Sequence, residues 1–219
     1  MSLVLLVRHG QASWGAADYD VLSDLGRRQS AALGTSLAGR GVTPDLVVRG
    51  SLRRHRETTD AADEAAGWGN GVVEDAGWDE FDHLGTLDGS VLFDHRDHEP
   101  YDERVRRFHA TIERWSSGEH DPEYRESFPA FQARVLGALD RTFERLGEKG
   151  TAVVFTSGGP VSWVAATLVD GGVPAWRRLS RVVVNSSVTK VHSGRWGTNL
   201  VSFNDHAHLE ADRDLLSYR

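Results

Sequence analysis

Arginine and histidine follow an apolar segment near the start of the sequence, and these residue types could bind and transfer a phosphoryl group. The apolar residues 3–7 run directly into Arg8, His9 and Gly10. A guanidinium pairs with two phosphate oxygens through its planar fork, so Arg8 suits a phosphate. Gly10 permits a tight turn and a close approach of the backbone to a ligand. A histidine satisfied in the core and an arginine in a salt bridge are the alternative.

A second basic cluster follows the apolar stretch "DLVV". The sequence continues as "GSLRRHRETT", in which we expect Ser51 to cap a helix that extends to Ala66. Free amides at a helix N-terminus attract anions, so arginines in that turn suit a phosphate. A solvated basic helix face is the alternative.

A third strand end is predicted in "VVFTSGGPVSW". A buried apolar run passes into Ser157 and Gly158 and then into an apolar helix. The turn would expose backbone amides to an anion, although Gly-Gly-Pro alone is common turn chemistry.

Short apolar runs and amphipathic helices alternate along the chain. Buried strands are expected at residues 3–7, 46–48, 72–73 and 152–155, with further sheet at 182–184, 188–191 and 199–203. Helical faces are expected from Leu25 to Leu37, between an N-cap at Ser23 and a stop at Gly41, and at 51–66, 105–115 and 128–146. This order predicts an α/β fold, a three-layer α/β/α sandwich with a mostly parallel central sheet. The carboxyl ends of its parallel strands would bring the three motifs together.

The chain of 219 residues is expected to form a single domain, 1–219, with an insertion at about 77–125 that covers the active site. Within that segment His95 and His98 are flanked by carboxylates. Without cysteine or a second ligand pair, we expect a solvated or substrate-lining segment rather than a metal site. No metal and no cofactor is expected.

Composition excludes several functions. Cysteine is absent, which removes disulfides and thiol nucleophiles, and the net charge of −7 argues against nucleic-acid or anionic-membrane binding. No apolar run is long enough to span a membrane, and "MSLVLLV" lacks the features of a signal peptide. A cytoplasmic protein is expected, and a homodimer is left open.

The motifs "LVRHGQAS", "LSDLGRRQSAALGTSL", "GSLRRHRETTDAA", "WDEFD" and "VVFTSGGPV" stand in this order along nearly the whole chain. Together they resemble the histidine phosphatase superfamily, also called phosphoglycerate-mutase-like. The resemblance implies that His9 is the nucleophile and that Arg8 and Arg54 bind phosphate, with Ser157 and Gly158 beside them. In that role a neutral imidazole attacks phosphorus with its unprotonated nitrogen, while an acceptor such as a backbone carbonyl holds the other nitrogen and the turn at Gly10 sets the orientation. The resemblance also implies Glu80 as the acid that protonates the leaving group.

Some positions depart from the family pattern or have rivals. Asp79 and Asp82 are rival acids. Ser157 stands where the family usually carries a second histidine, and a hydroxyl brings no positive charge. Another imidazole could substitute, and the sequence does not rank the candidates His55, His83, His192, His206 and His208.

The expected function is a metal-independent phosphomonoesterase that acts on a small phosphorylated metabolite through a phosphohistidine. Gln11, Ser13 and Trp14 are expected to line the substrate pocket, and Trp78 either flanks it or packs in the core. Gln11 and Gly15 replace residues of the pattern R-H-G-E-x-x-x-N found in mutases of the family. A mutase and a protein that binds a phosphorylated ligand without efficient turnover are the alternatives.

Overall fold

The computed structural model describes residues 1–13, 19–81 and 101–218. It divides into two compact units, Met1–Asp79 with Val135–Arg219 and, separately, Glu80–Arg134. Each unit is described by itself. Several residues singled out above lie outside the described residues: Trp14, Gly15, Asp82, His83, His95 and His98.

The described part of the first unit contains a six-stranded sheet in the order β3-β2-β4-β1-β5-β6. The strands are β1 (Ser2–Arg8), β2 (Leu46–Arg49), β3 (Val72–Glu74), β4 (Gly150–Thr156), β5 (Val188–Gly194) and β6 (Gly197–Asp205). Strands β1 to β4 run parallel, whereas β5 and β6 pair antiparallel. The mostly parallel sheet is therefore confirmed.

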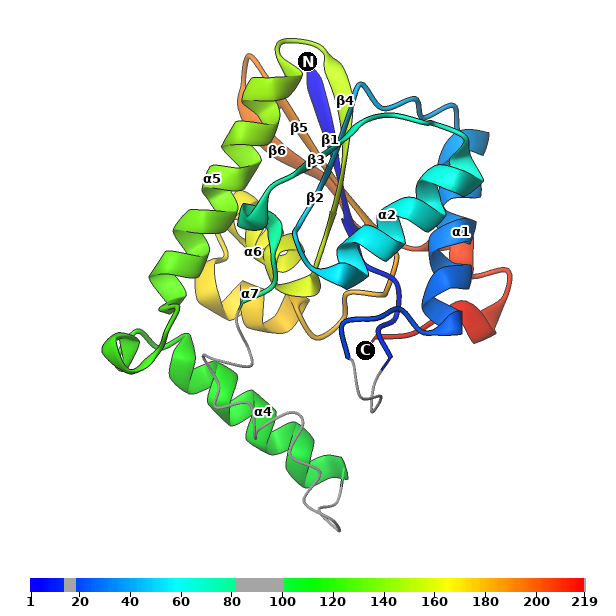
Figure 1. The fold of residues 1–219 in the computed structure, drawn as a ribbon. Helices are drawn as coiled ribbons and strands as arrows, with labels where there is room; N and C mark the ends of the chain where they lie inside the picture. Colours follow the sequence, from blue (N-terminus) through cyan, green and yellow to red (C-terminus); the bar gives the residue numbers. More distant parts are fainter. Residues whose placement is uncertain (14–18, 82–100, 219) are drawn as a thin grey trace. The chain divides into compact units, whose positions relative to one another are not determined.

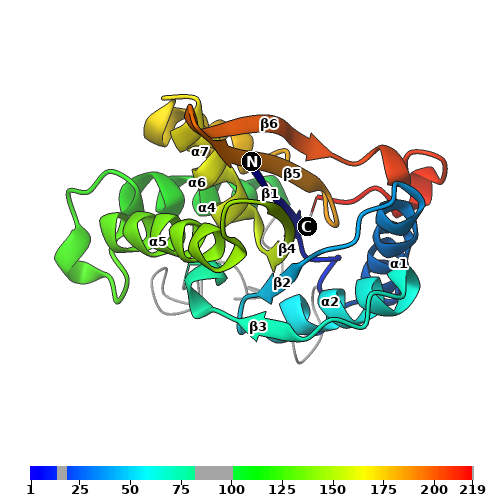
Figure 2. The same cartoon turned by 90° about the horizontal axis from the view of Figure 1, so that it is seen from above.

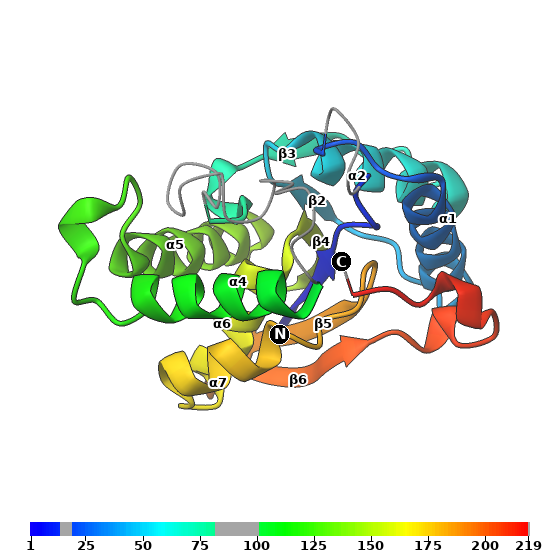
Figure 3. The same ribbon diagram turned by 90° about the horizontal axis from the view of Figure 1, so that it is seen from below.

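Helices cover both faces of this sheet, so the predicted α/β/α sandwich is also confirmed. The described helices are α1 (Asp24–Gly39), α2 (Arg53–Ala66), α4 (Tyr101–Trp115), α5 (Phe128–Leu146), α6 (Gly158–Leu168) and α7 (Gly172–Leu179), of which α4 belongs to the second unit. In the first unit, α1 and α2 lie on one side of the sheet, and α6 with the end of α5 lies on the other (Figures 1 and 2). Figure 3 shows the sheet from the side to which the carboxyl ends of the parallel strands point.

Apolar side chains of the sheet and of α1 build a dry core. Leu5, Val47 and Val153 come from three neighbouring strands and pack with Leu33 and Leu37 of α1. All five are essentially inaccessible to solvent. This burial fixes the parallel strands and thereby the loops at their carboxyl ends.

The ends of α1 form as predicted. Ser23 is the N-cap, and its hydroxyl accepts a hydrogen bond from the Gly26 amide. The helix ends at Gly39, and Gly41 follows with a φ of 72°, a left-handed conformation that suits glycine after a helix.

Two predictions at strand and helix ends are wrong. Ser51 does not cap α2: the N-cap is Leu52, without a side-chain cap, because the Ser51 hydroxyl donates to Asp79 instead. Val72 and Val73 form a strand, but β3 is the sheet edge and Val72 is exposed rather than buried.

Residues 182–184 are not part of the sheet either, although they are apolar. The side-chain amide of Asn204 forms hydrogen bonds with their backbone. Its Nδ2 donates to the Val182 carbonyl, and its Oδ1 accepts from the Val184 N–H. The Val183 carbonyl accepts from the Arg8 guanidinium. Because these backbone groups are bonded to side chains, they do not pair with a neighbouring strand, and β5 begins only at Val188.

The second unit, Glu80–Arg134, has its own aromatic cluster. The Trp115 ring lies 4.8 Å from Phe81, 4.9 Å from Phe128 and 5.5 Å from Phe131, between ring centroids. The Trp115 indole N–H donates to the Glu126 carbonyl. This unit overlaps the predicted insertion at 77–125, and its covering of the active site stays a prediction.

Candidate active site

His9 follows the end of β1, where the neighbouring backbone holds it on both sides. Its amide donates to the Thr156 carbonyl of β4 at 2.8 Å, and its carbonyl accepts from the Asn185 side-chain amide at 3.1 Å. The Ser186 amide bonds the Arg8 carbonyl at 3.0 Å. His9 is 4% exposed. The backbone that carries the imidazole is therefore fixed from both sides of β1.

The His9 imidazole is oriented by its own neighbour. Its Nδ1 lies 2.7 Å from the Gly10 carbonyl oxygen, which confirms the expected backbone acceptor. A carbonyl only accepts, so Nδ1 carries the proton and Nε2 holds the lone pair. Burial, followed by the charges of Arg54 and Arg8, lowers the His9 pKa well below its ordinary value. The ring is thus neutral at pH 7, as a nucleophile requires.

Gly10 is required by the close approach of β1 to α1. A Cβ at this position would lie 2.4 Å from the Gly26 carbonyl oxygen. The Gly10 amide donates to the Thr58 hydroxyl at 3.0 Å, and this hydroxyl donates to the Arg54 carbonyl. Thr58, which the sequence did not single out, therefore ties the His9 turn to α2.

Arg54 points inward from the first turn of α2, whereas Arg53 points to solvent. The Arg54 side chain is 4% exposed, and its Nη1 lies 2.7 Å from Oδ1 of Asp20. The Arg54 Nε is buried and has no hydrogen-bond partner in the described structure. Arg53 is 45% exposed and pairs with Glu57. This difference favours Arg54 as the phosphate ligand.

Arg8 ends β1 beside the beginning of α6. Its Nη1 donates to the carbonyls of Val183 and Tyr218. A Cβ at Gly158 would lie 3.6 Å from the Arg8 Nε, so the guanidinium lies next to the α6 N-terminus. A guanidinium and a helix N-terminus, both of which attract anions, therefore occur together beside His9.

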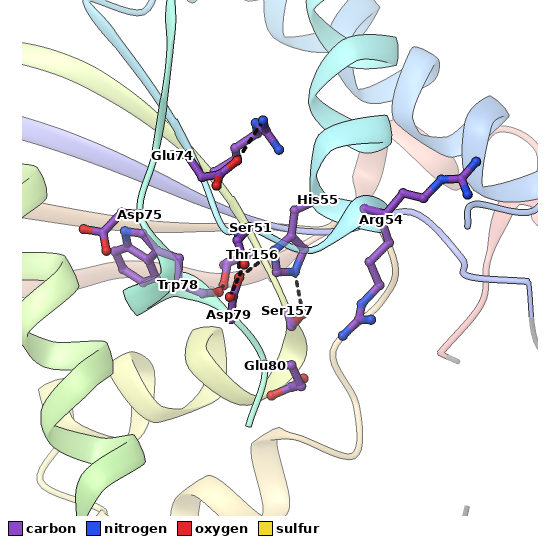
Figure 4. A network of polar contacts seen from close by, with 12 residues as sticks. Ser51, Arg54, His55, Glu74, Asp75, Trp78, Asp79, Glu80, Thr156 and Ser157 are labelled. Carbon is purple, nitrogen blue, oxygen red and sulfur yellow. Dashed lines mark hydrogen bonds and ion pairs between the residues drawn. The ribbon is translucent and has the colours of Figure 1, made fainter. Parts of the chain in front are cut away.

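Ser157 lies between β4 and α6 and contacts an imidazole from a distant part of the chain. Its Oγ is 2.7 Å from Nε2 of His55, and both residues are fully buried (Figure 4). The His55 ring lies 5.8 Å from the His9 ring, between centroids. His55 is thus the candidate imidazole that the structure brings to Ser157.

Asp79 is held as a carboxylate at this end of the sheet. Its Oδ1 accepts from the Ser51 amide at 2.6 Å, its Oδ2 accepts from the Ser51 hydroxyl, and Oδ1 lies 3.6 Å from Nδ1 of His55. Burial alone would raise the Asp79 pKa, but the interaction with His55 and the hydrogen bonds from Ser51 outweigh it and lower the pKa. An ionised carboxylate cannot donate a proton, which argues against Asp79 as the acid.

The remaining predicted residues are placed as follows. Glu80 is the first residue of the second unit, where its Oε1 accepts from the Phe81 amide at 3.2 Å. In the first unit, the Gln11 Oε1 accepts from the Ser23 hydroxyl at 2.9 Å, and the Ser13 amide donates to the Val21 carbonyl at 2.7 Å.

Trp78 packs in the core rather than flanking a pocket. It is fully buried, and its indole N–H donates to the Thr142 hydroxyl at 3.2 Å. Among the described residues, no group of three or more acidic or histidine side chains is placed to hold a metal ion. No helix within the described ranges is long and apolar enough to cross a membrane.

Comparison with known proteins gives the family. The family model of the histidine phosphatase superfamily (branch 1) matches residues 4–206. The chain therefore belongs to the histidine phosphatase superfamily. No curated protein matches the chain.

Solved structures share the fold. Phosphoserine phosphatase from Entamoeba histolytica, in complex with 3-phosphoglyceric acid, has a TM-score of 0.68 at 20% identity, with 95% of this chain and 100% of that chain covered. Mycobacterial glucosyl-3-phosphoglycerate phosphatase has a TM-score of 0.62 at 22% identity, with 93% of this chain and 98% of that chain covered. Phosphoglycerate mutase from Bacillus anthracis has a TM-score of 0.63 at 18% identity, with 95% of each chain covered.

Proposed function

We propose that this chain is a phosphatase that hydrolyses a small phosphomonoester through a phosphohistidine at His9, without a metal ion. One observation carries the proposal: the His9 Nδ1 is bonded to the Gly10 carbonyl, which leaves Nε2 as the nucleophilic atom. The charges of Arg54 and Arg8 act on the same imidazole. A neutral nucleophile beside two guanidinium groups suits attack on a dianionic phosphate.

The reaction would proceed in two displacements at phosphorus. In the first, His9 Nε2 forms a bond to phosphorus while the ester P–O bond breaks, and the leaving oxygen takes a proton. In the second, water attacks phosphorus and gives a proton back to the group that protonated the leaving oxygen, the N–P bond breaks, and phosphate leaves. Arg8 and Arg54 would neutralise the negative charge of the transferring oxygens. The family resemblance assigns the leaving-group proton to Glu80, and we retain that role as part of the proposal.

The class of substrate is proposed from the structural neighbours. Two of the solved proteins are named as phosphatases of phosphoserine and of glucosyl-3-phosphoglycerate, and a third as a phosphoglycerate mutase. Each of these names refers to a small phosphorylated metabolite. We therefore expect a compact, anionic phosphomonoester as the substrate of this chain.

The test is release of inorganic phosphate from an aryl phosphate near pH 6, in the presence of a chelator, by wild type and by His9→Ala. Activity in wild type that disappears in His9→Ala is the expected result. The same assay is repeated with phosphoserine, phosphoglycerate and sugar phosphates. Activity that survives in His9→Ala would refute the phosphohistidine route.

Two other outcomes would overturn the proposal in favour of its alternatives. Inorganic phosphate that binds without turnover of any ester would indicate a protein that binds phosphorylated ligands. Activity that depends on a bisphosphate primer, with transfer between hydroxyls and no net release, would indicate a mutase. Binding of phosphate is measured by calorimetry on the same preparation.

A further inference from the structure

His55 has no part in the reaction proposed above, yet it is fully buried beside the nucleophile. Its Nε2 lies 2.7 Å from Ser157 Oγ, and its Nδ1 lies 3.6 Å from Asp79 Oδ1. Figure 4 shows the imidazole between these two side chains. Three segments distant in the sequence thus meet at one side chain, which we call the Asp79–His55–Ser157 network.

Ser157 is placed by the sheet next to the reacting centre. Strands β1 and β4 are parallel neighbours in which Arg8 pairs with Thr156. His9 and Ser157 are therefore the next residues along each strand, and the His9 amide bonds the Thr156 carbonyl. A hydroxyl at this position is suited to contact a phosphoryl group held at His9.

We propose that the Asp79–His55–Ser157 network positions the Ser157 hydroxyl as a hydrogen-bond donor to the phosphoryl group that His9 accepts. His55 acts through Ser157 and is a positioning residue. The proposal rests on the proposed function because it assigns this role in the same site.

Hydrogen-bond accounting fixes the proton positions in the network before a phosphoryl group binds. An ionised carboxylate only accepts hydrogen bonds, so a neutral His55 carries its proton at Nδ1, toward Asp79. Its Nε2 then accepts, and the Ser157 hydroxyl donates to the ring. In this state the hydroxyl proton is directed away from the phosphoryl position.

A bound phosphoryl group reverses this arrangement. One proton enters the ring from solvent at Nε2, the imidazolium donates to both Asp79 and Ser157, and the hydroxyl proton turns to a phosphoryl oxygen. The proton returns to solvent when phosphate leaves. Burial lowers the His55 pKa to about 4, so the ring is neutral before a phosphoryl group brings its negative charge. The charged and titratable groups that face His55 are Asp79, Arg54, Asp20 and His9.

The backbone is shaped to permit this contact. A Cβ at Gly50 would lie 2.2 Å from Nδ1 of His55 and 2.5 Å from Oδ1 of Asp79. Any side chain at position 50 would therefore occupy the space in which the two groups meet. The absence of a side chain at this position independently supports the His55–Asp79 pairing.

The first test is a double-mutant cycle with His55→Ala, Ser157→Ala and the double variant. Each single change is expected to lower kcat by about 10²–10³-fold with a smaller effect on KM, as for loss of one oriented donor. If the two residues act as a unit, the double variant is no slower than the slower single variant. Multiplying losses would overturn the proposal. His208→Ala, which removes another partly buried imidazole, is the matched control and is expected to retain kcat.

The second test separates positioning from a merely structural role. Binding of inorganic vanadate is measured by calorimetry at pH 7 in two buffers of different ionisation enthalpy, which reports the protons taken up. Wild type is expected to take up about one proton more than His55→Gln. Equal uptake by the two proteins would overturn the proposal.

A third measurement identifies the phosphorylated residue. A phosphoenzyme trapped from labelled substrate should be acid-labile and stable to alkali, as phosphohistidine is. An acid-stable adduct that is absent in Ser157→Ala would make Ser157 the nucleophile and refute its role as a donor.

Failure of the proposed function would be distinguishable from failure of this inference. If wild type turns over no ester, vanadate affinities replace kcat in the same cycle. Non-additive losses there would still support the network, whereas unchanged affinities would refute it. If wild type is an active phosphatase and His55→Ala is equally fast, the function stands and the network proposal fails.

Discussion

The Nη1 of Arg54 lies 2.7 Å from the Oδ1 of Asp20, and this ion pair holds a buried guanidinium in the first turn of α2. The second Asp20 oxygen accepts from the Arg53 amide, so one carboxylate binds both the helix end and the arginine. Asp20 thereby orients Arg54, whose charge lowers the pKa of His9. The adjacent Arg53 side chain extends to solvent instead.

This contrast predicts different effects for neighbouring arginines. Arg54→Ala removes a preorganised cation and is expected to lower kcat/KM by about 10²–10³-fold. Arg53→Ala removes an exposed ion pair with Glu57 and should leave kcat/KM close to wild type. Steady-state kinetics on one aryl phosphate, with thermal unfolding as the folding control, measures both. Equal losses in the two variants would contradict the assignment of the phosphate ligand.

Glu80→Gln tests the proposed acid through the leaving group. An alkyl phosphate leaves as a strong base and needs a proton, whereas nitrophenolate leaves without one. We expect about 10²–10⁴-fold loss of kcat/KM on alkyl phosphates and a small change on p-nitrophenyl phosphate. Asp79→Asn is the comparison: the contacts with His55 and Ser51 keep the Asp79 pKa low, so any loss in this variant should be similar on both ester classes. If Glu80→Gln were equally slow on both ester classes, Glu80 would not be the acid.

Gly50→Ala tests the space in which His55 meets Asp79. The added methyl would approach the imidazole to 2.2 Å, and such overpacking costs about 1–3 kcal/mol of unfolding free energy. Gly39→Ala, where no atom lies within 4 Å of the added Cβ, is the control and should not destabilise the fold. Urea unfolding measures both variants. Adding His55→Ala to Gly50→Ala should recover part of the loss, and no recovery would mean that the ring is not the obstacle.

The fold and the strand-end residues were predictable because their signals are local. Residues 3–7 are continuously apolar and stop at Arg8 and His9, so the strand and its polar end occur in one window of sequence. The Ser23 cap is likewise local, since its hydroxyl accepts from Gly26 three residues later. Hydrophobic burial then determines which strands pair and brings the strand ends together.

His55 was one of five candidate imidazoles, and the sequence could not rank it because its contact with Ser157 is not local. Within "RRHR" it reads as part of a basic helix face, and its partner Ser157 is 102 positions away. Ser51 was assigned to the helix cap because the sequence does not reveal that Asp79 binds its hydroxyl. The segment 182–184 reads as strand because its apolar residues conceal backbone groups that bond to Asn204 and Arg8.

The burial of His55 also predicts how stability depends on pH. The His55 pKa is lowered from 6.5 to about 4, mainly by burial, so below pH 6.5 the unfolded chain binds a proton that the folded chain does not. The unfolding free energy therefore falls as pH drops from about 6.5 toward 4. At pH 5 this single group contributes on the order of 1–2 kcal/mol to the loss.

Urea unfolding at pH 7, 6 and 5 measures the effect, with His55→Gln as the variant that lacks the titrating ring. The variant should lose less stability than wild type over this range. Burial also lowers the His208 pKa to about 4, so His208 adds to the loss of stability at low pH. His208→Gln is therefore the matched comparison, and the stability changes of the two variants should add. If His55→Gln lost as much stability as wild type between pH 7 and 5, the His55 imidazole would not be neutral in the folded protein.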